Sequence, residues 1–127
     1  MKWIDQVDYA CASNWSSSYC VTVYVGGIRF YKPIKIGEIV KLESKVILTG
    51  NSSMHISIDV FSRNVKEKKF EKRTHCIIVF VAVDENGKSV EVPKWNPTTE
   101  KEIQMEQYAI KLKDLRKNIE DEMKPFL

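Results

Sequence analysis

Two acidic residues in an apolar N-terminal stretch are the first candidates for chemistry. Residues 1–12 contain Asp5 and Asp8, and the apolar positions follow the spacing of an α-helix. A helix that is apolar on nearly every side is expected to be buried, and a buried carboxylate is costly unless it is paired, hydrogen-bonded or used in chemistry. Asp5 is therefore either a reactive group or a cap whose charge suits the positive end of the helix dipole. We expect Asp8, one turn later, to face solvent or another subunit.

The remaining reactive side chains give little support for a metal or thiol site. Cys11, Cys20 and Cys76 have no metal-type spacing, and an odd count without such spacing favours reduced thiols in a cytosolic protein. His55 and His75 have no carboxylate or thiol at ligand spacing, so we interpret both as structural or surface residues. The Gly-x-Ser-x-Gly elbow of α/β-type serine hydrolases does not occur. These patterns predict neither a metal nor another cofactor.

Length and charge narrow the class of protein. A chain of 127 residues suits one domain with a real core, and its formal net charge of +3 comes from lysines spread along the sequence. This distribution gives no specific support for nucleic-acid binding. No run is long and apolar enough to cross a membrane, and the N-terminus does not resemble a signal peptide. We therefore expect a cytoplasmic protein that binds neither nucleic acid nor membrane.

The elements that must position these residues are a helix and four or five antiparallel strands. The polar residues 13–18 are predicted to form a loop, and Gly26-Gly27 to mark a bulge or a close backbone approach. Asn86-Gly87 is a hairpin signal, and the charged residues 64–72 are predicted to form an exposed turn. Strands are expected, from β-branched residues or from alternating apolar positions, at residues 20–31, 39–49, 54–62 and 76–83.

A second helix is predicted near the C-terminus. Thr99 and Glu102 have the spacing of a capping box, so the helix should begin there and run to about Met123. Its apolar residues form one narrow stripe, expected to pack on the domain or on a partner subunit: Met105, Tyr108, Leu112, Leu115, Ile119 and Met123. The predicted organisation is a domain at residues 1–93, a linker at 94–98 and this helix within 99–127. A helix followed by meandering strands is an α+β layout with the sheet packed over the helix.

Four segments, in order and in register, carry a resemblance to a known family. They are W-I-D-x-V-x-Y-A-C-A at residues 3–12, V-T-V-x-V-x-x-I-x-F-x-K-P-I at 21–34, G-x-S-S-M at 50–54 and F-V-A-V-D-x-x-G-K at 80–88. Together they resemble the hotdog-fold acyl-CoA thioesterases, a group that includes the bacterial cytosolic and brain acyl-CoA hydrolases. The match covers residues 1–93. It implies a hotdog fold, in which an antiparallel sheet wraps around the helix at residues 1–12.

The resemblance also implies a function and a set of site residues. Acyl-CoA would be hydrolysed to free fatty acid and CoA, with Asp5 as general base or nucleophile. The site would lie between two subunits of a homo-oligomer, either a dimer or a hexamer, and would need no prosthetic group. A plain hairpin turn is an equally good explanation of residues 50–53 on turn statistics. The residues that match the family's CoA-contacting turn and pantetheine tunnel are Asn51, Ser52, Ser53, Thr22, Val23 and Tyr24.

The front of this chain departs from the family pattern. Family members have a first strand and a Gly-Gly turn before the helix, where backbone N–H groups are expected to stabilise the oxyanion. Our hypothesis is that Met1 is an internal methionine of a longer reading frame, or that the gene is truncated.

Three alternative functions stay open at this point. The chain could be a catalytically inactive hotdog subunit that binds CoA or a partner protein. It could be an interaction module that works through its terminal helix. A hotdog dehydratase or isomerase would need a histidine paired with an acid near the buried helix, and that helix contains no histidine.

Overall fold

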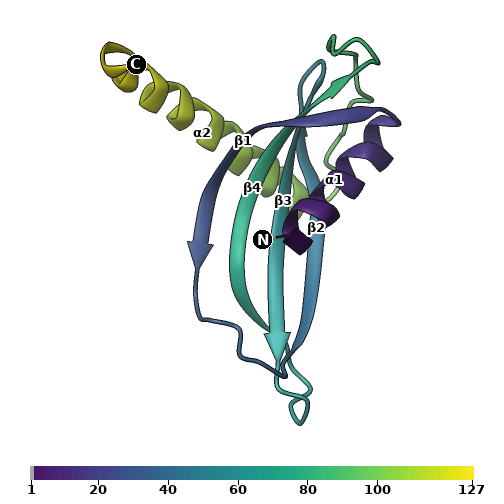
Figure 1. Cartoon of the computed structure of the whole chain (residues 1–127), viewed down its shortest axis with the longest axis vertical. Helices are drawn as coiled ribbons and strands as arrows, with labels where there is room; N and C mark the ends of the chain where they lie inside the picture. Colours follow the sequence, from purple (N-terminus) through teal and green to yellow (C-terminus); the bar gives the residue numbers. More distant parts are fainter. Residues whose placement is uncertain (1) are drawn as a thin grey trace.

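A four-stranded antiparallel sheet separates two helices in the computed structural model, which describes residues 2–127 (Figure 1). The side chains of Lys2, Trp3 and Asp5 lie outside this description. The strand order is β1-β4-β3-β2, so β1 and β2 form the two edges. The elements are α1 (Lys2–Ser16), β1 (Tyr19–Phe30), β2 (Ile39–Thr49), β3 (Ser53–Arg63), β4 (Glu71–Val83), α2 (Glu100–Met123) and the 3-10 turn η1 (Lys124–Phe126).

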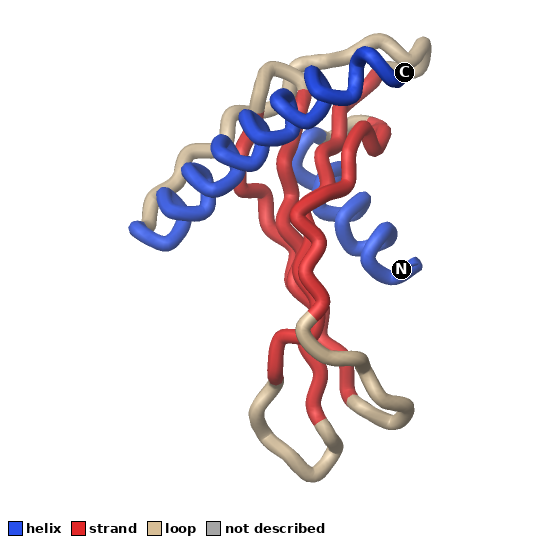
Figure 2. Tube along the Cα trace, turned by 90° about the vertical axis from the view of Figure 1, so that its left-hand side faces the viewer, coloured by secondary structure: helices blue, strands red, loops and turns tan. Residues whose placement is uncertain are grey.

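The main core lies between α1 and one face of the sheet. Alternate residues of β3 and β4 point to this face, and Ile4 and Ala12 of α1 are buried against them. Figure 2 shows α1 beside the sheet, near the label N, and α2 running across the upper end of the sheet, near the label C. This is the predicted α+β hotdog arrangement. The buried strand residues of this core are Cys20, Val46, Met54, Ile56, Ile58, Val60, Cys76, Ile78, Phe80 and Ala82.

Helix α1 is longer than the sequence pattern predicted. It continues through residues 13–16, where a loop was expected, and ends at Ser16, just before Ser17, whose φ is 56°. Ser16 Oγ donates a hydrogen bond to the Ala12 carbonyl oxygen at 2.8 Å, which satisfies its hydroxyl inside the helix. Trp15 Nε1 donates to the Pro93 carbonyl oxygen at 2.8 Å. The polar composition of this stretch concealed tertiary contacts that hold it in the helix.

The strands also differ in extent from the prediction. β4 begins at Glu71 rather than near residue 76, because Arg73 is held by Ser62 Oγ at 2.7 Å and by Glu38 Oε2 at 3.4 Å. The Asn-Gly turn forms, with Gly87 at φ 80°, but within the described residues it leads only to a single bridge between Val83 and Ser89. The sheet therefore has four strands, the lower of the two numbers expected.

The bulge predicted at Gly26-Gly27 is confirmed. The register of β1 against β4 shifts between Gly26 and Arg29, and Gly27 has φ 59°. A Cβ atom on Gly26 would come within 2.5 Å of the Tyr24 ring. Glycine at position 26 therefore lets the Tyr24 side chain fold over the strand, and glycine at position 27 allows the positive φ of the bulge.

Helix α2 has its predicted start and packs on the second face of the sheet. Thr99 Oγ1 accepts a hydrogen bond from the Glu102 N–H at 3.1 Å, and the Glu102 side chain accepts from the Thr99 N–H at 3.2 Å, which completes the capping box. Ala109 is fully buried against Ile47 and Ile77, with Met105, Tyr108, Leu48 and Leu112 around them. This packing fixes the first half of α2 on the domain. The domain was one of the two surfaces on which the apolar stripe of this helix was expected to pack.

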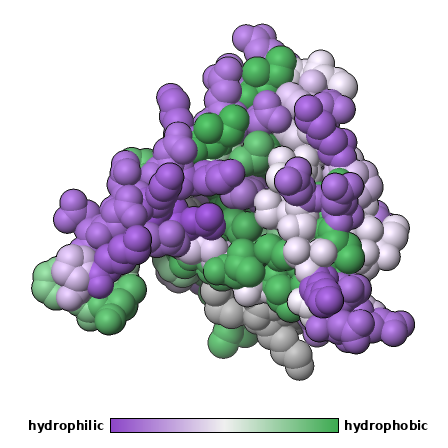
Figure 3. Space-filling view, turned by 90° about the horizontal axis from the view of Figure 1, so that it is seen from above, coloured by the Kyte–Doolittle hydropathy of each residue, from purple (hydrophilic) through white to green (hydrophobic). Residues whose placement is uncertain are grey.

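The second half of α2 extends past the sheet. Charged residues cover this arm in the view of Figure 3, and apolar residues gather at its tip. Among the residues 2–127 that the structure describes, no helix has the length and apolar character needed to span a membrane. The exposed apolar residues of this half and of the chain end beyond it are Leu115, Ile119, Met123, Phe126 and Leu127.

The capping box gives the first testable prediction. Replacing Thr99 by alanine removes the side-chain acceptor of the Glu102 N–H and should lower the free energy of unfolding by about 1 kcal/mol. Urea denaturation followed by circular dichroism measures this change. Lys117→Ala, an exposed position on the same helix, serves as the control and should be near neutral. An equal loss in both variants would contradict the assigned role of the cap.

Candidate functional site

The acidic residues of α1 occupy a helix that the sheet covers. Asp8 is fully buried, so the expectation that it faces solvent is wrong. Ser44 of β2 donates a hydrogen bond from Oγ to Asp8 Oδ1 at 2.9 Å, which ties α1 to the edge strand. Asp5 belongs to the first turn of α1, and its side chain, the predicted catalytic group, lies outside the described residues.

The other predicted site residues gather at one end of the sheet. Thr22 pairs with Phe80 of β4, and Phe80 pairs on its other side with Met54, next to the turn at residues 50–53. That turn is held by the Ala82 N–H, which donates to the Ser52 carbonyl oxygen at 2.9 Å, and by the Val92 N–H, which donates to the Asn51 carbonyl oxygen at 2.8 Å. The predicted CoA-contacting turn and the predicted tunnel strand are therefore one strand apart.

Asp5 is not at that end of the same chain. It lies near the start of α1, whereas the end of α1 leads directly into β1. At a rise of 1.5 Å per residue, the Asp5 and Ser16 backbones are about 16 Å apart along the helix axis. Within one chain, the predicted catalytic residue is therefore about three helical turns from the end of α1 that leads to β1.

Tyr24 and Val23 have different surroundings from Thr22. The Tyr24 ring lies against Gly26 and beneath the Arg116 guanidinium, whose carbon is 4.8 Å from the ring centroid. Val23 sits at a register shift and is exposed. Of the three tunnel residues predicted from the sequence, Tyr24 is therefore engaged with α2.

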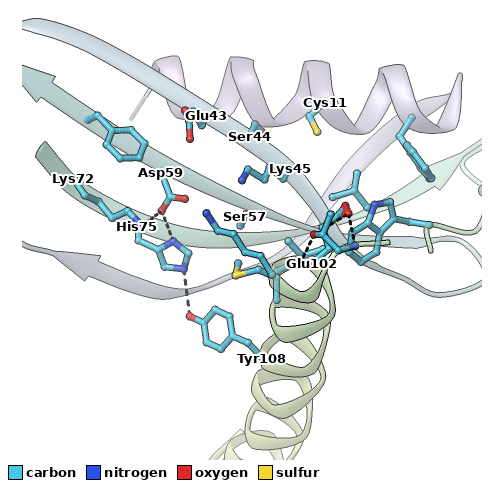
Figure 4. Close-up of a pocket in the computed structure, with 18 of the residues that line it drawn as sticks. Cys11, Glu43, Ser44, Lys45, Ser57, Asp59, Lys72, His75, Glu102 and Tyr108 are labelled. Carbon is cyan, nitrogen blue, oxygen red and sulfur yellow. Dashed lines mark hydrogen bonds and ion pairs between the residues drawn. The ribbon is translucent and has the colours of Figure 1, made fainter. Parts of the chain in front are cut away.

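A cavity of about 880 Å³ passes around the edge strand β2 (Figure 4). Because β2 is at the edge of the sheet, the cavity is lined both by α1 and by residues on the opposite face. Cys11 and Ser44 contribute from the α1 side, and Lys45, Ser57 and Glu102 from the α2 side. On its α2 side, the cavity is lined by polar and charged side chains that a bound molecule would contact.

Three side chains on the α2 side of this cavity form a connected chain of hydrogen bonds. His75 Nδ1 lies 2.7 Å from Asp59 Oδ1, and His75 Nε2 lies 3.3 Å from the Tyr108 hydroxyl (Figure 4). Lys72 Nζ is 3.3 Å from the same Asp59 oxygen. Both ring nitrogens of His75 are engaged within the chain, which suits a structural role for this histidine. The pair also lies on the face opposite α1, away from the helix where a dehydratase or isomerase would need it.

The electrostatics of these groups follow from their contacts. Burial raises the pKa of Asp59, but the hydrogen bond and charge of His75, together with Lys72, outweigh it and hold the pKa below its usual value. Burial raises the pKa of Tyr108. Burial also raises the pKa of the Cys11 thiol, and nearby Asp8 adds to this effect. Cys11 therefore stays protonated at neutral pH, which argues against a thiolate nucleophile.

The histidine environments could not be found from sequence spacing. Asp59, His75 and Tyr108 come from β3, β4 and α2, and only the sheet register and the docking of α2 bring them together. In the described part of the chain, no group of three or more His, Cys, Asp or Glu side chains is arranged to hold a metal ion. The cysteines are free thiols.

Comparison with known proteins assigns the chain to a family. The model of the thioesterase superfamily matches residues 1–69, more than half of the chain. The chain therefore belongs to the thioesterase superfamily. Protein VdlD of Helicobacter pylori is 34% identical over 116 residues, which are 91% of this chain and 66% of that protein. The chain thus spans about two thirds of the length of this relative.

Solved structures agree in fold over almost the whole chain. The acyl-CoA hydrolase from Staphylococcus aureus in complex with butyryl coenzyme A and coenzyme A has a TM-score of 0.89 and 28% identity, and covers 99% of this chain and 77% of its own. Structures of that hydrolase include variants with alanine in place of an asparagine, an aspartate or a threonine. An apo-hexameric acyl-CoA thioesterase has a TM-score of 0.87 and 31% identity over 92% of this chain and 75% of its own.

The Asp59–His75 pair predicts a pH-dependent contribution to stability. Because the pKa of Asp59 is lower in the folded chain, its stabilisation is present above the unfolded pKa of about 3.9 and is lost as pH falls through the folded value. Asp59→Asn should lower the unfolding free energy by about 1–2 kcal/mol at pH 7 and by progressively less below about pH 4.

Denaturant unfolding of both proteins across this pH range checks the prediction. Asp121→Asn, an exposed aspartate on α2, is the matched control and should change little at any pH. A deficit for Asp59→Asn that stays constant from neutral to acidic pH would contradict the ion-pair account.

Proposed function

We propose that the chain hydrolyses acyl-CoA thioesters to a free fatty acid and CoA. The observation that carries this proposal is the likeness of 99% of the chain, at a TM-score of 0.89, to a hydrolase whose structure holds butyryl coenzyme A and coenzyme A. Family membership and the positions of Asn51, Ser52, Ser53 and Thr22 at one end of the sheet support it. No cofactor or metal is needed for this hydrolysis.

Asp5 is the residue to which we assign the reaction. It lies on α1, the helix that the sheet covers, and a carboxylate can remove a proton from water or attack the thioester carbonyl. As a base, Asp5 removes a proton from water, and the resulting hydroxide attacks the thioester carbonyl. The C–S bond then breaks, and Asp5 passes the proton to the CoA thiolate. In the Staphylococcus aureus hydrolase, the substituted aspartate and threonine are separated by the same number of residues as Asp5 and Thr22.

The proposed site is shared between subunits of a homo-oligomer. We expect Asp5 of one copy to lie beside the turn at Asn51–Ser53 of another copy. Hexameric relatives make a dimer or a hexamer the expected assembly. We place the protein in the cytoplasm, because three free cysteines in the described residues suit a reducing compartment.

The direct test is steady-state release of CoA from butyryl-, octanoyl- and palmitoyl-CoA by the chain and by Asp5→Asn. Loss of a general base or nucleophile should reduce kcat by about 10²-fold or more, with little change in fold. Asp114→Asn, an exposed aspartate on α2, is the control and should retain full activity. Thermal stabilisation by CoA without turnover in any protein would contradict hydrolysis and favour a CoA-binding subunit.

A further inference from the structure

A second, smaller cavity lies under α2, on the face of the sheet opposite α1. Its volume is about 190 Å³, and it is enclosed by the bulge of β1, by β3 and β4, and by the middle of α2. Most of its wall is apolar. The residues that line it are Tyr24, Gly26, Gly27, His55, Ile77, Val79, Ala109, Leu112, Lys113, Leu115, Arg116 and Ile119.

His55 is the unexplained polar group of this cavity. It is only 5% exposed, and among the residues that the structure describes neither ring nitrogen has a hydrogen-bond partner. A neutral imidazole has one N–H donor and one acceptor, and leaving both unused in a buried place is costly. A buried polar side chain that lines a cavity without a partner from its own chain points to a partner from outside.

The charges around His55 show the sign of that partner. Arg116 and Lys113 line the same cavity, and its lining contains no acidic residue. Burial first, and then the positive charges of Arg116 and Lys113, lower the pKa of His55 to about 4. The imidazole is therefore neutral at pH 7 and can donate its N–H, while the two cations favour an anion.

Arg116 has no strong internal ion pair that would satisfy it. Its Nε is 3.8 Å from Glu120 Oε1, which is beyond hydrogen-bonding distance, and the Glu120 side chain is 65% exposed. The guanidinium instead rests over the Tyr24 ring at 4.8 Å. This stacking holds the charged group at the cavity without using its hydrogen-bond donors.

The remaining wall suits a short hydrocarbon chain. Ile77, Val79, Ala109 and Leu112 offer only apolar atoms to it. A Cβ on Gly27 would be in ordinary van der Waals contact with Leu112 Cδ1 at 3.5 Å and Ile77 Cδ1 at 3.9 Å, so this stretch of the wall is also apolar. The volume of about 190 Å³ is below the range of about 300–1,000 Å³ typical of drug-sized ligands, so the occupant should be small.

We propose that this cavity binds a short-chain monocarboxylate, with its carboxylate between Arg116, Lys113 and the His55 N–H and its tail among Ile77, Val79 and Leu112. The cavity lies on the face of the sheet opposite α1, the helix to which we assign hydrolysis, and Tyr24, a predicted pantetheine-tunnel residue, forms part of its wall. The acid that thioester hydrolysis releases has this chemistry, so a role in sensing the product rests on the proposed function, whereas the binding itself does not.

Calorimetry and NMR of the full chain test this site without any substrate. Hexanoate should bind with a Kd of about 1 mM or tighter, and should shift the ring resonances of His55 while leaving those of His75 in place. Because the sequence contains two histidines, the ring resonances that disappear in His55→Gln belong to His55 and those that stay belong to His75. Inorganic phosphate and 1-hexanol, which supply the charge or the tail alone, should bind at least about tenfold more weakly.

Variants separate a built site from nonspecific attraction. Arg116→Gln should weaken hexanoate binding by about tenfold or more, whereas Lys117→Gln, with the same loss of charge one residue away, should leave it unchanged. CoA at saturation should not displace hexanoate.

Three results would overturn the proposal: no His55 shift at about 10 mM hexanoate, equal effects of the two charge variants, or displacement by CoA. None of these results bears on turnover, which is measured separately. An inactive chain that binds hexanoate would refute only the proposed function.

Discussion

Burial of α1 against one face of a curved sheet is the constraint on which the rest of this structure depends. Ile4, Asp8 and Ala12 are buried along the helix, and apolar residues alternate along β3 and β4 to meet it. Since Asp8 is fully buried, its hydrogen bond with Ser44 also fixes how α1 lies relative to β2. A carboxylate on such a helix is removed from water unless the protein or a ligand forms a contact with it. Removal from water is the condition in which a carboxylate becomes a useful base.

The two faces of the sheet have different chemical character. The α1 face is mostly apolar and carries the helix to which we assign catalysis. The other face is held by α2 through Ala109, and it gathers both histidines: His75 in a satisfied network with Asp59 and Tyr108, and His55 in an apolar cavity beside two cations. One histidine therefore strengthens the fold, while the other is left able to bind a partner.

Features that depend on neighbours in sequence could be predicted, and those that depend on tertiary packing could not. The Thr99–Glu102 cap is local, and the alternate apolar residues of 54–62 are the ones that pack in the core against α1. The end of α1 was predicted wrongly because Trp15 is anchored by Pro93, which lies 78 positions away. The burial of Asp8 and the surroundings of His55 depend on which strand and which helix turn come to meet them. Neither is encoded in the spacing of those residues.

The central claim is that Asp5 of one subunit works with the CoA-binding turn of another, and mixing two inactive variants tests it most directly. Asp5→Asn removes the proposed reactive group, and a variant with Asn51→Asp and Ser52→Asp places carboxylates where the phosphates of CoA are expected. Unfolded together and refolded as mixed oligomers, they should regain about a quarter of the wild-type rate of CoA release, because hybrid subunit pairs contain one intact site. Mixtures that stay inactive, although hybrid oligomers form, would contradict the shared site.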